Sequence, residues 1–358
     1  MNAVSERLHW VDVCKGIGIL LVIYGHGLSG DSFRYIIYAF HMPLFFFLSG
    51  VIFHHKKHEQ FLPYLKKDIK GILLPYFLFA FISLGIWFLN RTPEYQTLHV
   101  LTKSITGILY GNAHNNALSF NVVLWFLPCL FVTKLAFWFV TKFIRRKKLL
   151  IPILGIASVL GYASSNIFPK LKLPFGAEIV LTSIVFFGAG HLLNSLSDEK
   201  KLVIQKYAKQ LFIISLLICV ATAMLSFSTY HQQVDIRLNR FHNFFFFYIA
   251  AFSGIISCMT LSILLNTNIL LKKLGKHSMI LFVWHLIIFS YITKFLRTFI
   301  TPQTIDQLRD YYLAPSYTIL SLAIILTASL LLRRAHVSKE WVKAMGFTLI
   351  TTFLFKEK

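Results

Sequence analysis

Charged residues are scarce in this sequence. Only 14% of its 358 residues are Asp, Glu, Lys or Arg, whereas 56% are hydrophobic. One soluble core of a chain this long cannot bury so much apolar surface, so the composition excludes an ordinary soluble protein. Mostly apolar stretches of about 18 residues or more recur along the whole chain, and each is long enough to cross a bilayer core of about 30 Å. We therefore expect lipid to cover much of the surface.

These stretches predict an all-α fold, a polytopic membrane protein built as a bundle of about ten transmembrane helices. We expect a single membrane domain over residues 1–358, with spans near 11–29, 35–54, 70–90, 121–141, 149–166, 176–194, 210–228, 243–265, 278–297 and 313–332. About ten residues precede the first span and no small-residue cleavage site follows it, so we interpret it as a retained anchor helix.

Acidic residues are the scarcer charge, with 14 Asp and Glu against 36 Lys and Arg and a net charge of +22. In a soluble protein this excess would suggest nucleic acid, but in this chain most basic residues follow the even-numbered spans. Positive charge marks the cytoplasmic side of a membrane protein. We therefore expect both termini in the cytoplasm, a location in the inner cell membrane, and no nucleic-acid partner.

Paired cysteines and internal repeats are also missing. The four cysteines lie singly inside predicted spans without a CxxC spacing, which favours core packing over disulfides or a metal site: Cys14, Cys129, Cys219 and Cys258. The missing repeat removes a common signature of secondary transporters. The longest linker, about 90–120, falls on the predicted outer side, holds a polar cluster around Asn115, and includes a possible short helix at 98–109.

The first span carries unusual polar residues in the string WVDVCKGIGILLVIYGHG. Lys15 and His26 are eleven residues apart, which returns to within about 20° of the same helix face after a rise of about 16 Å. Asp12 lies one turn before Lys15 and can pair with it. Ionisable residues at bilayer depth are costly, so they are candidates for function. The simpler interpretation is that Lys15 reaches the inner headgroups and His26 packs near the outer surface.

Two further histidines fall inside predicted spans. His41 is the second residue of the string FHMPLFFFLSG in the second span, and His285 lies in the string KHSMILFVWHLIIF in the ninth span. A single histidine in a helix bundle is more often a packing residue. Three of them in one small bundle favour a site.

Two strings near span ends allow two interpretations each. In KKDIKGILLPY, Lys67 and Lys70 are three residues apart, and they are either ordinary cytoplasmic charge or a clamp for an anionic cytosolic ligand. In LWFLPCLF, Trp125 is either part of an aromatic belt or a stacking surface for a sugar.

Together these five strings, in their order along the chain, resemble the acyltransferase 3 membrane proteins, in particular their fucose 4-O-acetylase-like branch, over nearly the whole chain. The resemblance implies an O-acyltransferase that moves an acyl group, usually acetyl, from cytosolic acyl-CoA to a hydroxyl of a sugar or cell-surface polysaccharide. The expected partners are acyl-CoA as co-substrate, a glycan acceptor and membrane lipid, with a homo-oligomer possible. No bound cofactor and no metal are expected.

The resemblance also implies roles for particular residues. His26 matches the family's catalytic histidine, Lys15 its basic partner, and Lys67 and Lys70 a paired-Arg motif on the acyl-CoA side. Lys stands where the family has Arg at all three positions, which keeps the charge but loses the planar fork for phosphate. We expect His285 and His41 beside His26, with His285 orienting it or donating to an oxyanion. Asn115 and Trp125 are the predicted acceptor residues.

Two questions stay open at the level of the sequence. His26 either takes the proton of the acceptor hydroxyl as a base or carries the acyl group covalently. A transporter or flippase of sugars or lipid-linked glycans would also have about ten spans with polar residues in the bundle. The missing repeat and the pair of Lys15 and His26 on one helix favour the acyltransferase.

Overall fold

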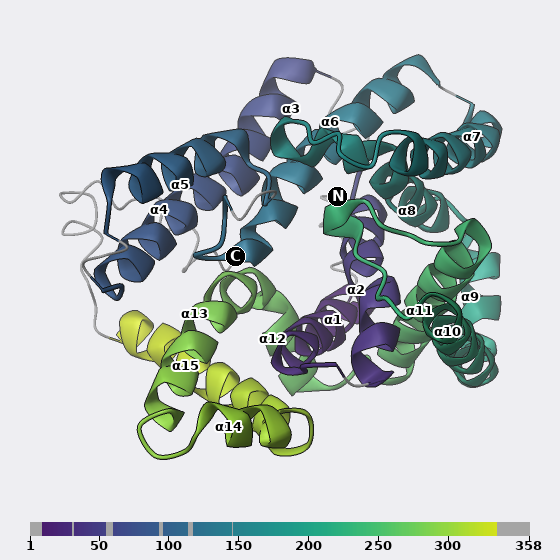
Figure 1. Cartoon of the computed structure of the whole chain (residues 1–358). Coiled ribbons are helices and arrows are strands. Elements are labelled where there is room, and N and C mark those ends of the chain that lie inside the picture. The colour runs from purple at the N-terminus through teal and green to yellow at the C-terminus, as the bar shows by residue number, and fades with distance from the viewer. Residues whose placement is uncertain are drawn as a thin grey trace.

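A computed structural model describes residues 9–30, 32–54, 60–92, 96–113, 117–144 and 146–334 of the chain (Figure 1). Within these ranges ten helices or continuous helical segments are long and apolar enough to cross a membrane. The described part holds no β-strand, only an isolated bridge between Asp235 and Arg240. The predicted all-α, polytopic membrane fold is confirmed.

Long helices alternate along the chain with short helices and turns. The α-helices are α1 (His9–Gly27), α2 (Ser32–Val51), α3 (Phe61–Asp68), α4 (Leu74–Leu89), α5 (Leu98–Tyr110), α6 (Phe126–Phe143), α7 (Lys147–Ile167), α8 (Val180–Asn194), α9 (Asp198–Lys206), α10 (Ala208–Tyr230), α11 (Phe244–Leu264), α12 (Ile269–Lys276), α13 (Ser278–Leu296), α14 (Pro302–Leu308) and α15 (Ala314–Arg334). Short turns of other helix types are η2 (Ile69–Leu73), η5 (Val122–Trp125), η6 (Pro174–Ile179), η7 (Ile236–Leu238) and η8 (Arg309–Leu313).

Two spans begin earlier than the apolar pattern predicts. The third helical segment starts at Phe61 rather than near residue 70, and the tenth starts at Pro302 rather than near residue 313. Each passes through a π-helical turn, η2 or η8, before its apolar part begins. Hydropathy marks where a helix enters lipid, whereas the backbone hydrogen bonds continue into the polar segment in front of it.

The short helix expected at 98–109 is present as α5, Leu98–Tyr110. The Thr97 side chain accepts a hydrogen bond from the backbone N–H of Val100 and caps its first turn. Gly111 ends it in the left-handed conformation at φ 67°, where a β-carbon would collide with the ring of Phe175. The four cysteines are buried with free thiols, as predicted for packing residues.

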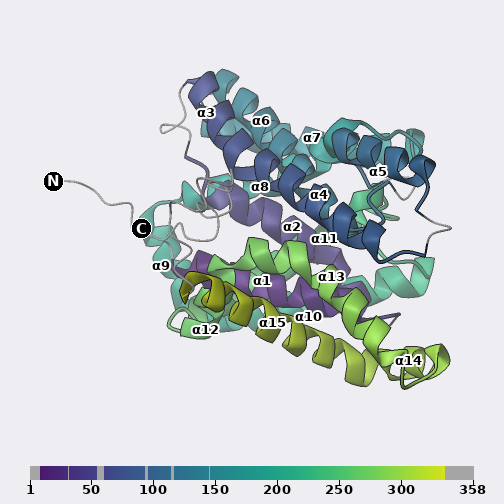
Figure 2. The same cartoon turned by 90° about the vertical axis from the view of Figure 1, so that its left-hand side faces the viewer.

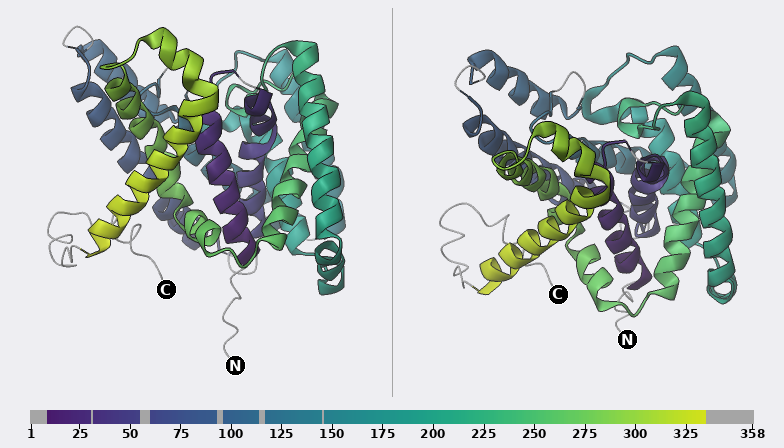
Figure 3. Two further views of the ribbon diagram at one scale, coloured as in Figure 1. Left: turned by 90° about the horizontal axis from the view of Figure 1, so that it is seen from below. Right: turned by 60° about the horizontal axis from the view of Figure 1, so that its bottom comes forward.

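Helices α1 and α2 lie at the centre of the bundle. Helix α1 packs against α2, α11, α12, α13 and α15, and α2 packs against α8, α10 and α11. Figure 3 shows α15 crossing diagonally beside α1 and α13. The two helices that carry His26 and His41 are thus held on several sides.

The ends of the bundle are distinct (Figure 2). Elements α3, α9 and α12, which follow even-numbered spans, lie at one end, and α5 and α14, which follow odd-numbered spans, lie at the other. We call the latter the His26 end, because α1 finishes there. Successive linkers of a chain that crosses a membrane must alternate between its two sides, and this alternation separates the basic even-numbered linkers from His26.

Glycines allow two pairs of central helices to touch backbone to backbone. A β-carbon at any of these four positions would collide with a backbone carbonyl group of the facing helix: Gly16 and Gly275 between α1 and α12, and Gly50 and Gly190 between α2 and α8. Small residues let helices approach closely in lipid, where packing rather than hydrophobic burial holds them together. These two contacts, which we call the glycine seams, fix α1 and α2 in the bundle.

Candidate active site

His26 lies one residue before the end of α1 and is half-buried. Its side chain lines two cavities at the His26 end, a small one of about 170 Å³ and a large one of about 620 Å³. The large cavity has the size of ordinary ligand pockets, which run from about 300 to 1,000 Å³. An imidazole shared by two cavities can touch two different reactants.

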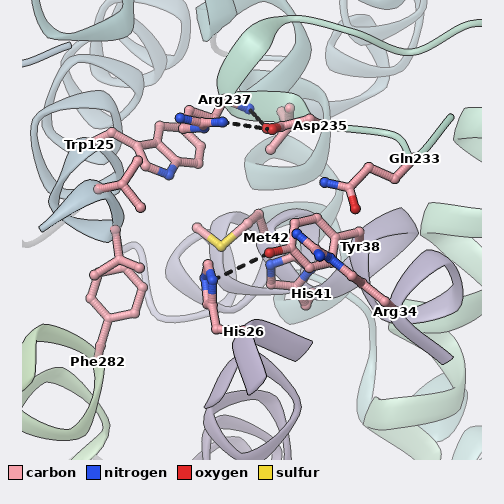
Figure 4. A pocket seen from close by; sticks show the side chains of 13 residues that line it. His26, Arg34, Tyr38, His41, Met42, Trp125, Gln233, Asp235, Arg237 and Phe282 are labelled. Carbon is pink, nitrogen blue, oxygen red and sulfur yellow. Dashed lines mark hydrogen bonds and ion pairs between the residues drawn. The ribbon is translucent and has the colours of Figure 1, made fainter. Parts of the chain in front are cut away.

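Helix α2 forms one wall of the small cavity (Figure 4). It runs back beside the end of α1, which brings Tyr38 and His41 to His26. The Tyr38 hydroxyl lies 3.3 Å from Nδ1 of His26, and the rings of Tyr38 and His41 are 4.8 Å apart between centroids. The guanidinium carbon of Arg34 lies 5.1 Å from the centre of the Tyr38 ring. This wall therefore sets an imidazole, a phenol and a cation beside His26.

The facing wall comes from distant parts of the chain. Trp125 ends η5, and Gln233, Asp235 and Arg237 belong to the connection between α10 and α11. Asp235 accepts hydrogen bonds from the backbone and the side chain of Arg237, at 3.0 and 3.1 Å. These bonds hold both charged side chains in place, so the small cavity presents a flat indole and fixed polar groups opposite His26 (Figure 4).

His285 stands behind His26 and is fully buried, with 5.3 Å between the two ring centroids. Its Nδ1 lies 3.2 Å from the backbone oxygen of Leu281. A carbonyl oxygen only accepts, so Nδ1 carries the hydrogen, and in the neutral ring Nε2 is an acceptor. No described residue donates to that buried Nε2. A buried acceptor without a partner is costly, so the site is built to receive a donor at this position.

The large cavity opens between α4, α13 and α14. Four of its lining side chains are basic: Arg91, Lys294, Arg297 and Arg309. Nε of Arg309 donates a 3.1 Å hydrogen bond to the backbone oxygen of Gly27, the residue after His26. This bond places a guanidinium group directly beside the end of α1.

Four of the sequence-predicted residues meet at this site. His26, His41 and Trp125 line the small cavity, and His285 lies against His26. The donor residues lie elsewhere: Lys15 is half-buried on the first turns of α1, and Lys67 and Lys70 are exposed on α3 and η2 at the opposite end. Asn115 lies outside the described residues.

Sequence reasoning missed several lining residues of the small cavity: Arg34, Tyr38, Gln233, Asp235 and Arg237. A signal for some of them was present. Basic residues are disfavoured in linkers on the outer side of a membrane, and carboxylates are few in this chain, so Arg34 and the pair of Asp235 and Arg237 stand out from the charge pattern.

Glu178 is a buried carboxylate at a span end, and it does not reach His26. It accepts hydrogen bonds from the Asn112 side chain at 2.9 Å and from the backbone of Leu173 at 3.0 Å. In the adjacent linker, burial lowers the pKa of Lys172, while the charge of Glu178 opposes that shift. These contacts tie the end of α5 to η6, so Glu178 has a structural role at the His26 end of the bundle. Among the described residues no cluster of His, Cys, Asp and Glu has the makings of a metal site.

Comparison with protein families assigns nearly the whole chain to a family. The model of the acyltransferase domain, acyltransferase family 3, matches residues 8–334, which include every element from α1 to α15. Comparisons with curated proteins and with solved structures gave no match. The matched range includes both cavities and all the residues that line them.

Proposed function

Because the chain belongs to the acyltransferase 3 family of membrane acyltransferases, we propose that it is an O-acetyltransferase of the fucose 4-O-acetylase-like kind. In this proposal it takes an acetyl group from cytosolic acetyl-CoA and transfers it to a hydroxyl of a sugar or cell-surface polysaccharide. The site lies in the inner cell membrane, with both termini cytoplasmic, because the even-numbered linkers carry most of the basic residues.

The observation that carries this proposal is the position of His26 between two cavities. Acyl transfer needs a base that the acceptor hydroxyl can reach, and a glycan that occupies these cavities would place a hydroxyl at His26 while the thioester arrives along α1. As a base, His26 takes the hydroxyl proton while the alkoxide oxygen attacks the thioester carbonyl. The tetrahedral intermediate then expels the CoA thiolate, which receives the proton from His26, so that the ester and free CoA are formed.

In this proposal Nε2 is the reactive nitrogen of His26, because Nδ1 contacts the Tyr38 hydroxyl. When Nδ1 carries the hydrogen and donates it to the Tyr38 oxygen, Nε2 has the free lone pair that a base needs. The covalent route, with an acyl group on His26, would begin from the same lone pair. Trp125 offers its indole for stacking on a sugar ring, and His41 completes the wall from α2.

His285 contributes as an acceptor in this proposal. Its Nε2 has no donor among the described residues, and its ring centroid lies 5.3 Å from that of His26, so it is suited to hold a hydroxyl or the protonated His26. A neutral His285 with Nδ1 bonded to Leu281 cannot donate from Nε2 to an oxyanion. Of the two roles the sequence leaves open, the geometry favours orientation.

The donor reaches His26 from the other end of α1. Lys15 lies eleven residues before His26, a rise of about 16 Å along the helix. Lys67 and Lys70 add exposed positive charge at the same end of the bundle. We propose that these three ammonium groups attract the phosphates of acetyl-CoA, while its thioester arm extends along α1 toward His26.

Proteoliposomes with labelled acetyl-CoA and a panel of glycans test the proposal. Wild-type protein should deposit label on at least one glycan, and the ester should be released by mild alkali. A protein that moves a glycan across the vesicle membrane without ever acylating it would instead support the transporter interpretation.

A further inference from the structure

The large cavity is strongly basic on the side away from His26. Its charged lining consists of four basic side chains against one carboxylate, that of Asp306, which is 71% exposed. The basic residues come from three separate segments, the ends of α4 and α13 and the start of η8, which converge at the His26 end (Figure 2). Chain segments that converge with charge of one sign repel each other unless a counter-charge binds between them.

Internal contacts use only part of this positive charge. Arg309 bonds to the Gly27 backbone and lies 3.9 Å from a carboxylate oxygen of Asp306, and the guanidinium carbon of Arg91 lies 4.5 Å from the ring centre of Trp87. Lys294 and Arg297 are exposed, and no carboxylate of the described residues pairs with either. Two cations at the cavity mouth are therefore available to a ligand.

Membrane insertion does not account for these residues. They follow odd-numbered spans, where the charge pattern of the chain predicts the outer side and where basic residues are disfavoured. A ligand that carries negative charge explains why they are placed around a cavity shared with His26. Arg and Lys bind phosphate and carboxylate groups through charge-assisted hydrogen bonds.

We propose that the large cavity binds the anionic part of the acceptor, a glycan that carries a phosphate or a carboxylate, and that Lys294 and Arg297 contact this group while a hydroxyl of the same glycan lies at His26. This inference rests on the proposed function and adds the substrate class. The anionic group stays on the glycan throughout, so the chemistry of transfer is unchanged, and the acceptor is held at a distance from the reacting hydroxyl.

The test compares two acceptors that differ only in charge, a neutral trisaccharide and the same trisaccharide with a phosphate ester. The variant is Lys294→Gln with Arg297→Gln. The matched control is Lys103→Gln with Lys170→Gln, which removes the same charge from exposed positions in odd-numbered linkers away from the cavity. Binding of the phosphorylated trisaccharide is measured by calorimetry, and transfer is measured with labelled acetyl-CoA in vesicles of zwitterionic lipid.

We expect wild-type protein to bind the phosphorylated trisaccharide and to prefer it over the neutral one in kcat/KM. The preference should fall at least about 10-fold in the cavity variant and stay in the control, because two charge-assisted contacts are lost only in the former. Equal use of both acceptors by wild-type protein would overturn the inference and leave the proposed function standing. If the phosphorylated trisaccharide bound but neither trisaccharide were acylated, the proposed function would be contradicted and the anion-binding site would stand.

Two further outcomes would also overturn the inference. If the cavity variant raised KM for acetyl-CoA instead of the acceptor, the large cavity would hold the donor. If its effect were seen only in vesicles that contain anionic lipid, and equally with both trisaccharides, the cations would bind lipid phosphates rather than the acceptor.

Discussion

His26 of α1 and His285 of α13 lie with their ring centroids 5.3 Å apart. At this distance two imidazolium ions would repel each other strongly in a medium of low dielectric constant. A proton taken by His26 during transfer is therefore best accommodated while His285 is neutral. In the proposed mechanism the pair acts as a unit in which one ring reacts and the other accepts a hydrogen bond.

His26→Ala should lower acyl transfer by at least about 10²-fold, because the base that takes the hydroxyl proton is lost. The protein should remain in the membrane and keep its thermal stability, since His26 is half-buried and lines open space. The measurement is the rate of label transfer from acetyl-CoA. His99→Ala, an exposed histidine on α5, is the control and should be unaffected. Normal turnover of the His26 variant would remove this residue from the mechanism.

The role of His285 as a hydrogen-bond acceptor can be tested with one variant that keeps an acceptor atom and one that removes it. His285→Gln retains an acceptor near the position of Nε2, whereas His285→Phe fills the volume without one. We expect the Gln variant to keep kcat within about 10-fold of wild type and the Phe variant to lose clearly more, with little change in either KM. Thermal stability measured for both variants controls for packing. Equal activity of the two variants would contradict the role as an acceptor.

Lys67→Ala combined with Lys70→Ala should raise the apparent KM for acetyl-CoA and leave the acceptor KM nearly unchanged. Each charge-assisted contact to a phosphate is worth about 1.5 to 3 kcal/mol. The same removal of two charges at exposed positions on α7, Lys147→Ala with Lys148→Ala, is the control. A shift of the acceptor KM, or an equal shift in the control, would show that these lysines do not hold the donor.

Topology is tested by the labelling of single cysteines in a background where the four native cysteines are replaced by Ala. Lys103→Cys, on exposed α5, should react with an impermeant thiol reagent in intact cells. Lys147→Cys, at the start of α7, should react only after permeabilisation. The reverse pattern would place His26 at the cytoplasmic face and the proposed donor lysines outside, where acetyl-CoA does not occur.

The sequence is sufficient for the spans, and it singles out three histidines that the fold brings close together. Long apolar runs report directly on lipid crossing, so ten spans were predicted and ten are present in the described part of the chain. His26, His41 and His285 could be singled out one by one because polar groups are costly in lipid. Their proximity was an expectation that only the packing of α1 against α2 and α13 could establish.

The connection between α10 and α11 could not be predicted in this way. Asp235 and Arg237 reach the small cavity because that connection folds back over the end of α2, with an isolated bridge from Asp235 to Arg240 and a single turn of η7. Such irregular backbone has no hydrophobic periodicity from which its conformation could be predicted. The basic lining of the large cavity was hidden for a different reason, since its members lie on three segments that are distant in the sequence.

The glycine seams affect the entropy cost of arranging the candidate site. Helices α1 and α2 meet α12 and α8 at backbone distance, so sliding either helix would press a β-carbon against a facing carbonyl group. The same two helices carry His26, Tyr38 and His41, so part of the entropy cost of placing these side chains is met on folding rather than when a ligand binds. The candidate site is thus held in the bundle by residues that have no side chain at all.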